Sequence, residues 1–363
     1  MSLSRKSWPG SLAICLLWAA SPVPAWAWGH AGHQLIGSLA DEMLAGTPAA
    51  KKVAALLGPA LKDLKTAAPW PDCVRDVAFR LPDSFKYEPA KPPFHSQACV
   101  PFEGDIERKR MEDYAKRNWH NCPDVDGHKH AGACHRSYHF TDVAVQHNRY
   151  SRQFTGTSEH DIVGILQAAV TVLRSGKPAI GLPSLRDRKE ALLLIAHLVG
   201  DLHQPLHVGA IYLRDDGTPA DPDATPPPPG PVLETRGGNS LEIGASDLHE
   251  AWDTIPSALK LGSLTTGPGL KRRQALLAEA RALPATTGAA DSWPERWATD
   301  TVLASQAAFP GLRFTRKGAA KADHWAVQFQ DATAYEKDRE ALQRRQLTQA
   351  AAHLAALLRS VWP

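Results

Sequence analysis

Helical periodicity is the feature that most constrains what this sequence can fold into. Apolar residues recur every three or four positions in four long segments, which places them on one face of an α-helix. In the second of these segments, Ser158 and Asp161 have the spacing of a capping box at a helix start. The segments are 33–44, 158–176, 187–204 and 335–362. Long alternating patterns typical of strands are scarce, so the sequence predicts a mainly α protein.

Two irregular segments interrupt the predicted helices. Residues 80–135 are rich in Pro, Cys, His and charged side chains, and residues 214–237 include the run DDGTPADPDATPPPPGP. The second run is incompatible with a helix and indicates an exposed Pro-rich loop. The 363 residues could form one large or two ordinary domains. Neither a repeat nor a clear linker divides them, so we expect a single domain over residues 28–363.

Residues 1–27 have the features of a secretion signal. Arg5 and Lys6 precede the apolar run SLAICLLWAA, and the small-x-small sequence AWA ends at Ala27. An uncleaved anchor is the alternative, but the run is short for a bilayer. We therefore expect a chain that starts at Trp28, is secreted or periplasmic, and has no membrane attachment.

Removing residues 1–27 takes away two basic side chains and lowers the formal net charge from +3 to +1. A nearly neutral surface does not attract nucleic acid nonspecifically, so any attraction for phosphate must be local.

Four cysteines remain after the signal, an even number in an oxidising compartment, which predicts two disulfides. Cys122 and Cys134 enclose a short loop and are the first expected pair, which leaves Cys73 with Cys99. Histidines in the same insertion could add a metal site, although we expect them to be solvated beside a disulfide. They are His128, His130 and His135.

The segment AHLVGDLHQPLH, residues 196–207, carries the strongest chemical signal. His197 and Asp201 are four residues apart, so on a helix they project from one face and can share a metal ion. They could instead be polar residues on a solvated face. The preceding residues are nearly all apolar, however, and a buried His and Asp need partners. Pro205 should end the helix before His207 and direct that imidazole elsewhere.

A second pair, His249 and Asp253 in SDLHEAWD, has the same spacing. The glycines of RGGNS, just upstream, permit close backbone approach to a ligand. Asp72 in APWPDCVRD and His139 in SYHFTD add one carboxylate and one imidazole. Imidazoles and carboxylates without thiolates are typical of zinc in a hydrolytic site.

Cleavage after Ala27 would itself create a ligand. Trp28 would then carry a free α-amino group, whose pKa is about 8, so its neutral form binds metal readily. The amino nitrogen and the carbonyl oxygen of Trp28 can chelate one ion, with His33 nearby on the first helix.

The ordered blocks WGHAGH, PWPD, YHFTD, HLVGDLHQPLH, GGN and LHEAWD resemble the S1/P1 nucleases, which depend on zinc and are related in fold to zinc phospholipase C. The resemblance spans the chain after the signal and implies a single-domain, multi-helix fold with three zinc ions in a cleft. It implies one zinc on Asp72, His139, His197 and Asp201, and a second on Trp28, His33 and the bridging Asp201. It implies a third zinc on His207, His249 and Asp253.

The same resemblance implies an exported, monomeric endonuclease that hydrolyses single-stranded RNA and DNA to products with 5′-phosphates, with 3′-nucleotidase activity as an extension. Zinc would lower the pKa of the attacking water, and Asp72 and Arg75 would act at the reacting phosphate. Asn239 matches a residue near the scissile phosphate. Phe140 and Asp142 match a base-binding pair, although a core position is the plain alternative for Phe140.

Two other functions remain open at this stage. A zinc phospholipase C shares the N-terminal Trp and most ligands, but usually has Glu where this chain has Asp253. A zinc-binding protein without catalysis would have little need of Arg75 or of one carboxylate bridging two ions. The segment between Asp72 and His139 is longer than is usual in the family, which affects the rim of the cleft.

Overall fold

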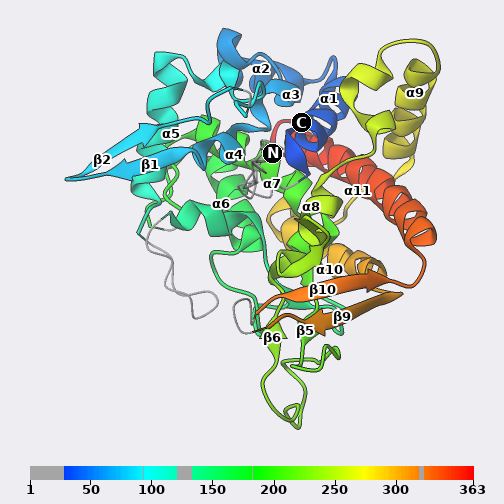
Figure 1. Ribbon diagram of the computed structural model, residues 1–363. Coiled ribbons are helices and arrows are strands. Elements are labelled where there is room, and N and C mark those ends of the chain that lie inside the picture. Colours follow the sequence, from blue (N-terminus) through cyan, green and yellow to red (C-terminus); the bar gives the residue numbers. More distant parts are fainter. Residues whose placement is uncertain (1–27, 93, 121–132, 182, 319–322) are drawn as a thin grey trace, which may run out of the picture.

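The computed structural model describes residues 28–92, 94–120, 133–181, 183–318 and 323–363. Helices form most of the ordered elements (Figure 1), which confirms the mainly α class. They are α1 (Gly29–Leu44), α2 (Pro48–Leu61), α3 (Leu64–Ala67), α4 (Trp70–Val74), α5 (Asp105–Arg117), α6 (Ile162–Ser175), α7 (Arg188–Asp201), α8 (Leu248–Asp253), α9 (Gly267–Ala282), α10 (Trp293–Ser305) and α11 (Ala332–Val361).

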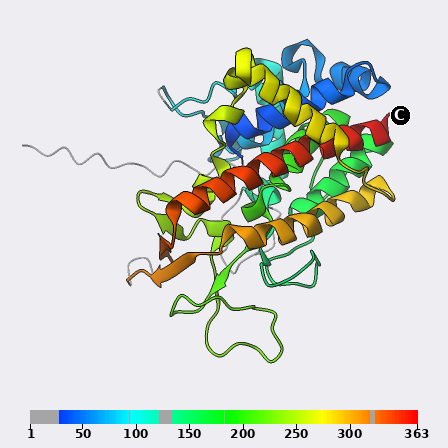
Figure 2. The same ribbon diagram turned by 90° about the vertical axis from the view of Figure 1, so that its right-hand side faces the viewer.

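Helix α7 lies at the centre of this arrangement (Figure 1). Every residue from Glu190 to Asp201 is buried, so the helix has no solvated face. It packs against α6, α1 and α11. Figure 2 shows α11, 30 residues long, crossing the molecule between α9 and α10. Because α7 is covered all round, the polar side chains at its end must find partners inside the protein.

The strands are short and form small sheets. They are β1 (Val77–Arg80), β2 (Ser84–Tyr87), β3 (Val143–Ala144), β4 (Gly209–Ala210), β5 (Tyr212–Leu213), β6 (Leu233–Glu234), β7 (Leu241–Ile243), β8 (Ser246–Asp247), β9 (Leu312–Arg316) and β10 (Trp325–Phe329). One sheet has four strands in the order β8-β7-β10-β9, with β7 and β10 parallel. Strand β3 pairs in parallel with β4, with Val143 opposite Gly209. This pairing brings the residues after His139 beside those after His207.

The predicted helices are present, with shifted ends. Helix α6 begins at Ile162, and its N-cap is Asp161, which accepts from the N–H groups of Val163 and Gly164. The capping-box prediction at Ser158 was therefore wrong by three residues, although the Ser158 N–H does donate to Asp161. Helix α7 ends at Asp201, before Pro205, as expected.

The insertion at 80–135 is more regular than predicted. It contains part of the β1–β2 hairpin and the 13-residue helix α5. The sequence DIERKRMEDYAKR of α5 is dominated by charge, so its buried positions, Met111 and Tyr114 among them, leave a weak apolar pattern.

The disulfide between Cys73 and Cys99 is present, as predicted. Cys122, His128 and His130 lie outside the described residues. His135 is buried between the rings of Trp119 and Tyr114, so the prediction of a solvated side chain was wrong for it. Burial lowers the pKa of His135 to about 3. Every helix in the described ranges is too short or too polar to cross a membrane.

Candidate metal centre

The end of α7 supplies two side chains of a buried His–Asp cluster. His197 and Asp201 are both fully buried, and His197 Nε2 lies 3.0 Å from Asp201 Oδ2. The other ring nitrogen, Nδ1, lies 2.8 Å from the carbonyl oxygen of Ala68 and donates its hydrogen there. That hydrogen bond fixes the tautomer and leaves Nε2 as an acceptor, the form that binds a metal ion.

Three other elements bring their side chains to the same point. Helix α1 supplies His33, α4 supplies Asp72, and the 3₁₀ turn Cys134–His139 supplies His139. His139 Nδ1 lies 3.0 Å from His197 Nε2, and Asp72 Oδ1 lies 3.7 Å from the same atom. The sequence placed Asp72 and His139 in no element, and the structure gives each a short helical turn.

Asp201 faces two sides of this cluster. Its Oδ2 lies 2.9 Å from His139 Nδ1 and 3.0 Å from His197 Nε2, whereas its Oδ1 lies 3.1 Å from His33 Nε2. One carboxylate thus presents Oδ2 to His139 and His197 and Oδ1 to His33. This arrangement suits a carboxylate that bridges two cations.

Trp28 anchors the start of α1 beside this cluster. Its side chain is fully buried, and the indole N–H donates to the carbonyl oxygen of Gly200 at 2.8 Å. A Cβ on the next residue, Gly29, would lie 3.6 Å from the backbone oxygen of Asp253, so the start of α1 lies beside the end of α8. A side chain at position 200 would meet His33 Nδ1 at 2.9 Å, so Gly200 allows α1 to approach α7 closely.

A second group joins the 3₁₀ turn Pro205–His207 to α8. His207 Nε2 and His249 Nε2 lie 3.1 Å apart, and His249 Nε2 lies 3.4 Å from Asp253 Oδ2. Both rings donate from Nδ1 to backbone carbonyls at 2.7 Å, His207 to His139 and His249 to Gly237. Gly237 has φ 54° and sits so close to the Leu206 carbonyl that a Cβ would lie 2.3 Å from its oxygen. Only glycine fits there.

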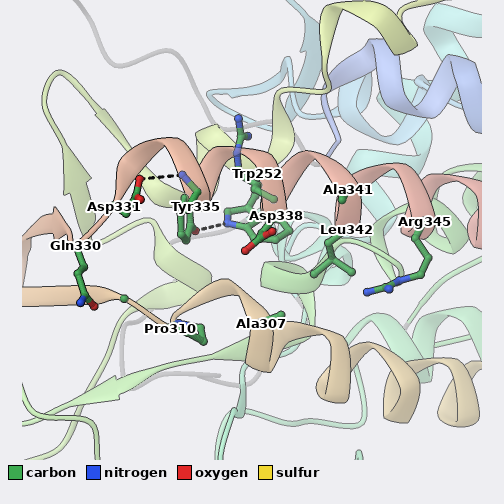
Figure 3. A pocket seen from close by; sticks show the side chains of 13 residues that line it. Trp252, Ala307, Pro310, Gln330, Asp331, Tyr335, Asp338, Ala341, Leu342 and Arg345 are labelled. Atoms are coloured by element: carbon green, nitrogen blue, oxygen red, sulfur yellow. Dashed lines mark hydrogen bonds between the residues drawn. The ribbon is translucent and has the colours of Figure 1, made fainter.

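Helix α8 is held in place by α11. Figure 3 shows the indole N–H of Trp252 donating to the hydroxyl of Tyr335, at 2.9 Å. Gln343 donates its amide to the carbonyl oxygen of Trp252 at 2.7 Å, and Arg339 donates to that of Ala251. The pocket of about 600 Å³ in Figure 3 lies on the outer side of these contacts and contains none of the candidate ligands.

The residues fit divalent cations. Several of their buried polar atoms have no hydrogen bond within the described residues, which is costly unless another group satisfies them. These atoms are both ring nitrogens of His33, both carboxylate oxygens of Asp72, Asp201 Oδ1 and Asp253 Oδ2. In each of three sets of side chains, one ligand atom of each member lies within 4.8 Å of those of the other two; the sets are His33 with Asp72 and His197, His139 with His197 and Asp201, and His207 with His249 and Asp253. Nitrogen and oxygen donors without thiolate suit zinc.

The protonation states agree with this fit. Burial lowers the pKa of His139 to about 4 and that of His249 to about 3, so both rings are neutral near pH 7. Burial alone would raise the pKa of Asp201, but the charge of a protonated His197 holds it well below its usual range. Burial alone would lower the pKa of His197, but Asp201 and Asp72 raise it, so a cation bound here would replace that proton. Burial raises the pKa of Asp253 well above its usual range, so a cation beside this carboxyl group would favour its ionised form.

The residues expected to act on a substrate lie at different depths. Arg75 follows α4, and its Nη1 lies 3.8 Å from Asp72 Oδ1. Asp142 is buried, and a Cβ on Gly237 would lie 3.4 Å from its Oδ1, which places this carboxylate near His249. Phe140 is half-buried directly after His139. Asn239 uses its amide to donate to the Arg236 carbonyl at 2.7 Å, so in this structure it closes a local turn.

Sequence reasoning missed two polar contributors. His30, on α1, places Nε2 3.9 Å from Asp72 Oδ2 and Nδ1 2.6 Å from the Ser96 hydroxyl. Its signal was visible as the first histidine of WGHAGH. Gln204 donates its amide to Asp253 Oδ1 at 2.7 Å and thereby orients that carboxylate. Gln204 lies within HLVGDLHQPLH, but only the histidines and the aspartate of that segment were interpreted as functional residues.

Comparison with known proteins agrees with this geometry. A family model described as S1/P1 Nuclease matches residues 28–362. Endonuclease 2 from Arabidopsis thaliana is 26% identical over 248 residues, which cover 67% of this chain and 60% of that protein. Endonuclease 4 from the same plant is 35% identical over 77 residues, which cover 20% of this chain and 18% of that protein. The chain thus spans about three fifths of the first relative and a smaller part of the second.

Proposed function

This chain belongs to the S1/P1 nuclease family, and on that premise we propose that it is an exported, zinc-dependent endonuclease acting on single-stranded RNA and DNA. The observation that carries the proposal is the position of Asp201, whose Oδ2 faces His139 and His197 while its Oδ1 faces His33. A structural zinc site needs only a closed set of four ligands, whereas a shared carboxylate between adjacent ions is typical of hydrolytic sites.

We assign three zinc ions to the centre. Asp72, His139, His197 and Asp201 hold one, and His207, His249 and Asp253 hold another. Trp28, His33 and Asp201 hold the ion between them, with the amino group that signal cleavage creates at Trp28. When bound, zinc supplies a Lewis acid and lowers the pKa of a coordinated water molecule.

The protein's own side chains would position the substrate. The Arg75 guanidinium, beside Asp72, is placed to neutralise charge that develops on the phosphate oxygens during the reaction. The Asp142 carboxylate accepts hydrogen bonds from a base edge, and the Phe140 ring stacks on the base face. A paired base cannot present its face, so this pair of residues favours single strands. Asn239 would contact the scissile phosphate after leaving its turn.

The products follow from which oxygen departs. Release of the 3′ oxygen leaves a 3′-hydroxyl on the upstream fragment and a 5′-phosphate on the downstream fragment, and the same reaction on a 3′-mononucleotide releases phosphate, which is a 3′-nucleotidase reaction. To His207, His249 and Asp253 we assign the cation that would neutralise the departing oxygen.

One experiment separates this function from its rivals. The zinc-loaded chain starting at Trp28 is given a single-stranded oligonucleotide in one reaction and phosphatidylcholine vesicles in another. We expect fragments with 5′-phosphates, abolished by a zinc chelator, and intact phospholipid. Hydrolysis of the phospholipid with an intact oligonucleotide would identify a phospholipase C instead. Zinc binding without either reaction would indicate a non-catalytic zinc-binding protein.

A further inference from the structure

A second His–Asp cluster lies outside the candidate metal centre. His147 follows β3, and Asp221 and Asp223 lie in the Pro-rich loop between β5 and β6. His147 Nε2 lies 2.8 Å from Asp223 Oδ2 and 3.6 Å from Asp221 Oδ1. From these contacts we propose that His147, Asp221 and Asp223 bind a further divalent cation, of which zinc is the best fit.

The spacing of the ligand atoms matches a shared ion. Atoms that each lie roughly 2.0–2.2 Å from a zinc ion are about 3–3.5 Å from one another. One atom from each of the three side chains lies within 4.8 Å of the other two. In the candidate metal centre, the corresponding atoms of His249 and Asp253 are 3.4 Å apart. Small side-chain rotations therefore bring the three atoms onto one cation.

Neighbouring groups orient all three side chains. The His147 ring stacks face to face on Phe154, with centroids 3.6 Å apart and planes 4° apart. Asp223 Oδ1 accepts from the backbone N–H and hydroxyl of Thr155 at 3.0 and 2.6 Å. The Asp223 N–H donates to Asp221 Oδ1 at 2.9 Å. Hydrogen bonds of this kind hold ligands in position around metal ions.

The cluster also has an excess of negative charge. Two carboxylates share one imidazole, and no Lys or Arg among the described residues forms an ion pair with either of them. Even a protonated His147 would leave a net charge of −1. The side chains of His147, Asp221 and Asp223 are 14%, 26% and 20% exposed, so solvent only partly screens this charge. A divalent cation would neutralise it, and the imidazole favours zinc over calcium or magnesium.

The cation would join two loops. The loop that carries His147 continues to Gly156, whose carbonyl oxygen accepts the backbone N–H of Asp142 at 3.0 Å. Bound metal would therefore fasten the Pro-rich loop to the segment that holds Asp142. Its role is structural, and it neither requires nor supplies the proposed nuclease reaction.

The test counts zinc in the full chain starting at Trp28. Asp221→Asn removes the negative charge but keeps an oxygen that accepts the Asp223 N–H. Asp216→Asn is the matched control, because Asp216 lies in the same loop and accepts from Thr218, outside the cluster. After excess metal is removed, zinc and protein are quantified by elemental mass spectrometry.

We expect the unaltered chain and Asp216→Asn to hold one zinc ion per chain more than Asp221→Asn. Equal zinc content in all three, or a difference that appears only in millimolar zinc, would overturn the proposal and leave a simple hydrogen-bonded cluster. If circular dichroism shows that Asp221→Asn is unfolded, His147→Gln replaces it, with the same two outcomes. The readout is a difference in metal content, so its failure is distinct from a failure of the nuclease assay.

Discussion

At the scale of single residues, Asp201 is central, because its two oxygens face different imidazoles, Oδ1 that of His33 and Oδ2 that of His139. Replacing it with Asn removes the charge that neutralises two adjacent cations while keeping the shape. We expect Asp201→Asn to bind less zinc and to cleave single-stranded DNA at least about 100-fold more slowly, since even outer-shell changes cost 10–100-fold.

Elemental analysis and a cleavage assay on the same preparation measure both effects. Asp300→Asn, an exposed position on α10, is the matched control and should leave both unchanged. Full zinc content and full activity in Asp201→Asn would contradict the bridging role.

Arg75 belongs to the same scale but acts on the substrate. Arg75→Ala should lower kcat by about 100-fold, as removal of a group that stabilises developing charge does, with zinc content unchanged. Arg75→Lys keeps the charge without the planar fork and should recover only part of kcat. Steady-state kinetics on a short oligonucleotide, with elemental analysis as control, measures this. An unchanged kcat in Arg75→Ala would show that Arg75 is a surface residue without a role in the reaction.

At the scale of elements, the contact of α11 with the residues after α7 makes stability depend on pH. His203 Nε2 and His353 Nδ1 lie 2.7 Å apart, and the His353 ring stacks on Trp297. Burial lowers the pKa of His203 to about 4 and that of His353 to about 2, against 6.5 in an exposed histidine. Below pH 6.5 the unfolded chain therefore binds more protons than the native chain, and stability falls as the pH falls.

The variant His353→Phe keeps an aromatic ring against Trp297 and removes one of these protonation sites. We expect its free energy of unfolding to decrease less between pH 6.5 and pH 5 than that of the unaltered chain. Urea unfolding followed by circular dichroism at the two pH values measures the difference. An equal decrease in both proteins would show that His353 does not take part.

The contact between α8 and α11 gives a second prediction at this scale. Gln343 donates to the carbonyl oxygens of Trp252 and Thr254, at the end of the helix that carries His249 and Asp253. In Gln343→Leu, the affinity for one of the zinc ions should fall by about 10-fold, which is in the range of outer-shell changes. Zinc titration of the metal-free protein measures it, and an unchanged affinity for all ions would contradict the positioning role.

Long elements could be predicted from the sequence, whereas short ones could not. The apolar spacing of α6, α7 and α11 extends over several turns and is therefore visible in the sequence itself. Helix α4 has five residues, too few to show a period, so the sequence identified Asp72 by its residue type and could not place it. The charged helix α5 was missed because tertiary contacts, and not its own pattern, decide which side is buried.

The candidate ligands show the same division. The spacing of His197 and Asp201, and of His249 and Asp253, predicted which side chains share a helix face. The distances between elements, such as 3.1 Å from His33 to Asp201, arise only when α1 packs on α7. His30 approaches Asp72 because α1 and α4 both pack on α7; the sequence shows the histidine in WGHAGH but not this contact.

At the scale of the whole molecule, the fold gathers side chains from α1, α4, α7 and α8 into one buried centre in a nearly neutral protein. Positive charge for a phosphate substrate would then come from bound cations rather than from the surface. This view also gives a role to the proposed cleavage after Ala27, because Trp28 starts the helix that carries His33 and its indole donates to Gly200, next to Asp201.

A chain that keeps Ala27 before Trp28 has an amide nitrogen where the cleaved chain has an amine. We expect it to bind one zinc ion more weakly than the chain that starts at Trp28 and to have lower activity. Isothermal titration of both metal-free proteins with zinc compares them. Identical titrations would show that the amino group of Trp28 is not a ligand.

Restoring activity to the metal-free protein tests most directly whether this chain is a zinc-dependent nuclease. The chain that starts at Trp28 is stripped of metal, given zinc in steps, and incubated at each step with a single-stranded oligonucleotide. We expect cleavage to appear as the zinc sites fill and the fragments to carry 5′-phosphates. Cleavage at full rate without metal, or an intact oligonucleotide with all sites filled, would contradict this expectation.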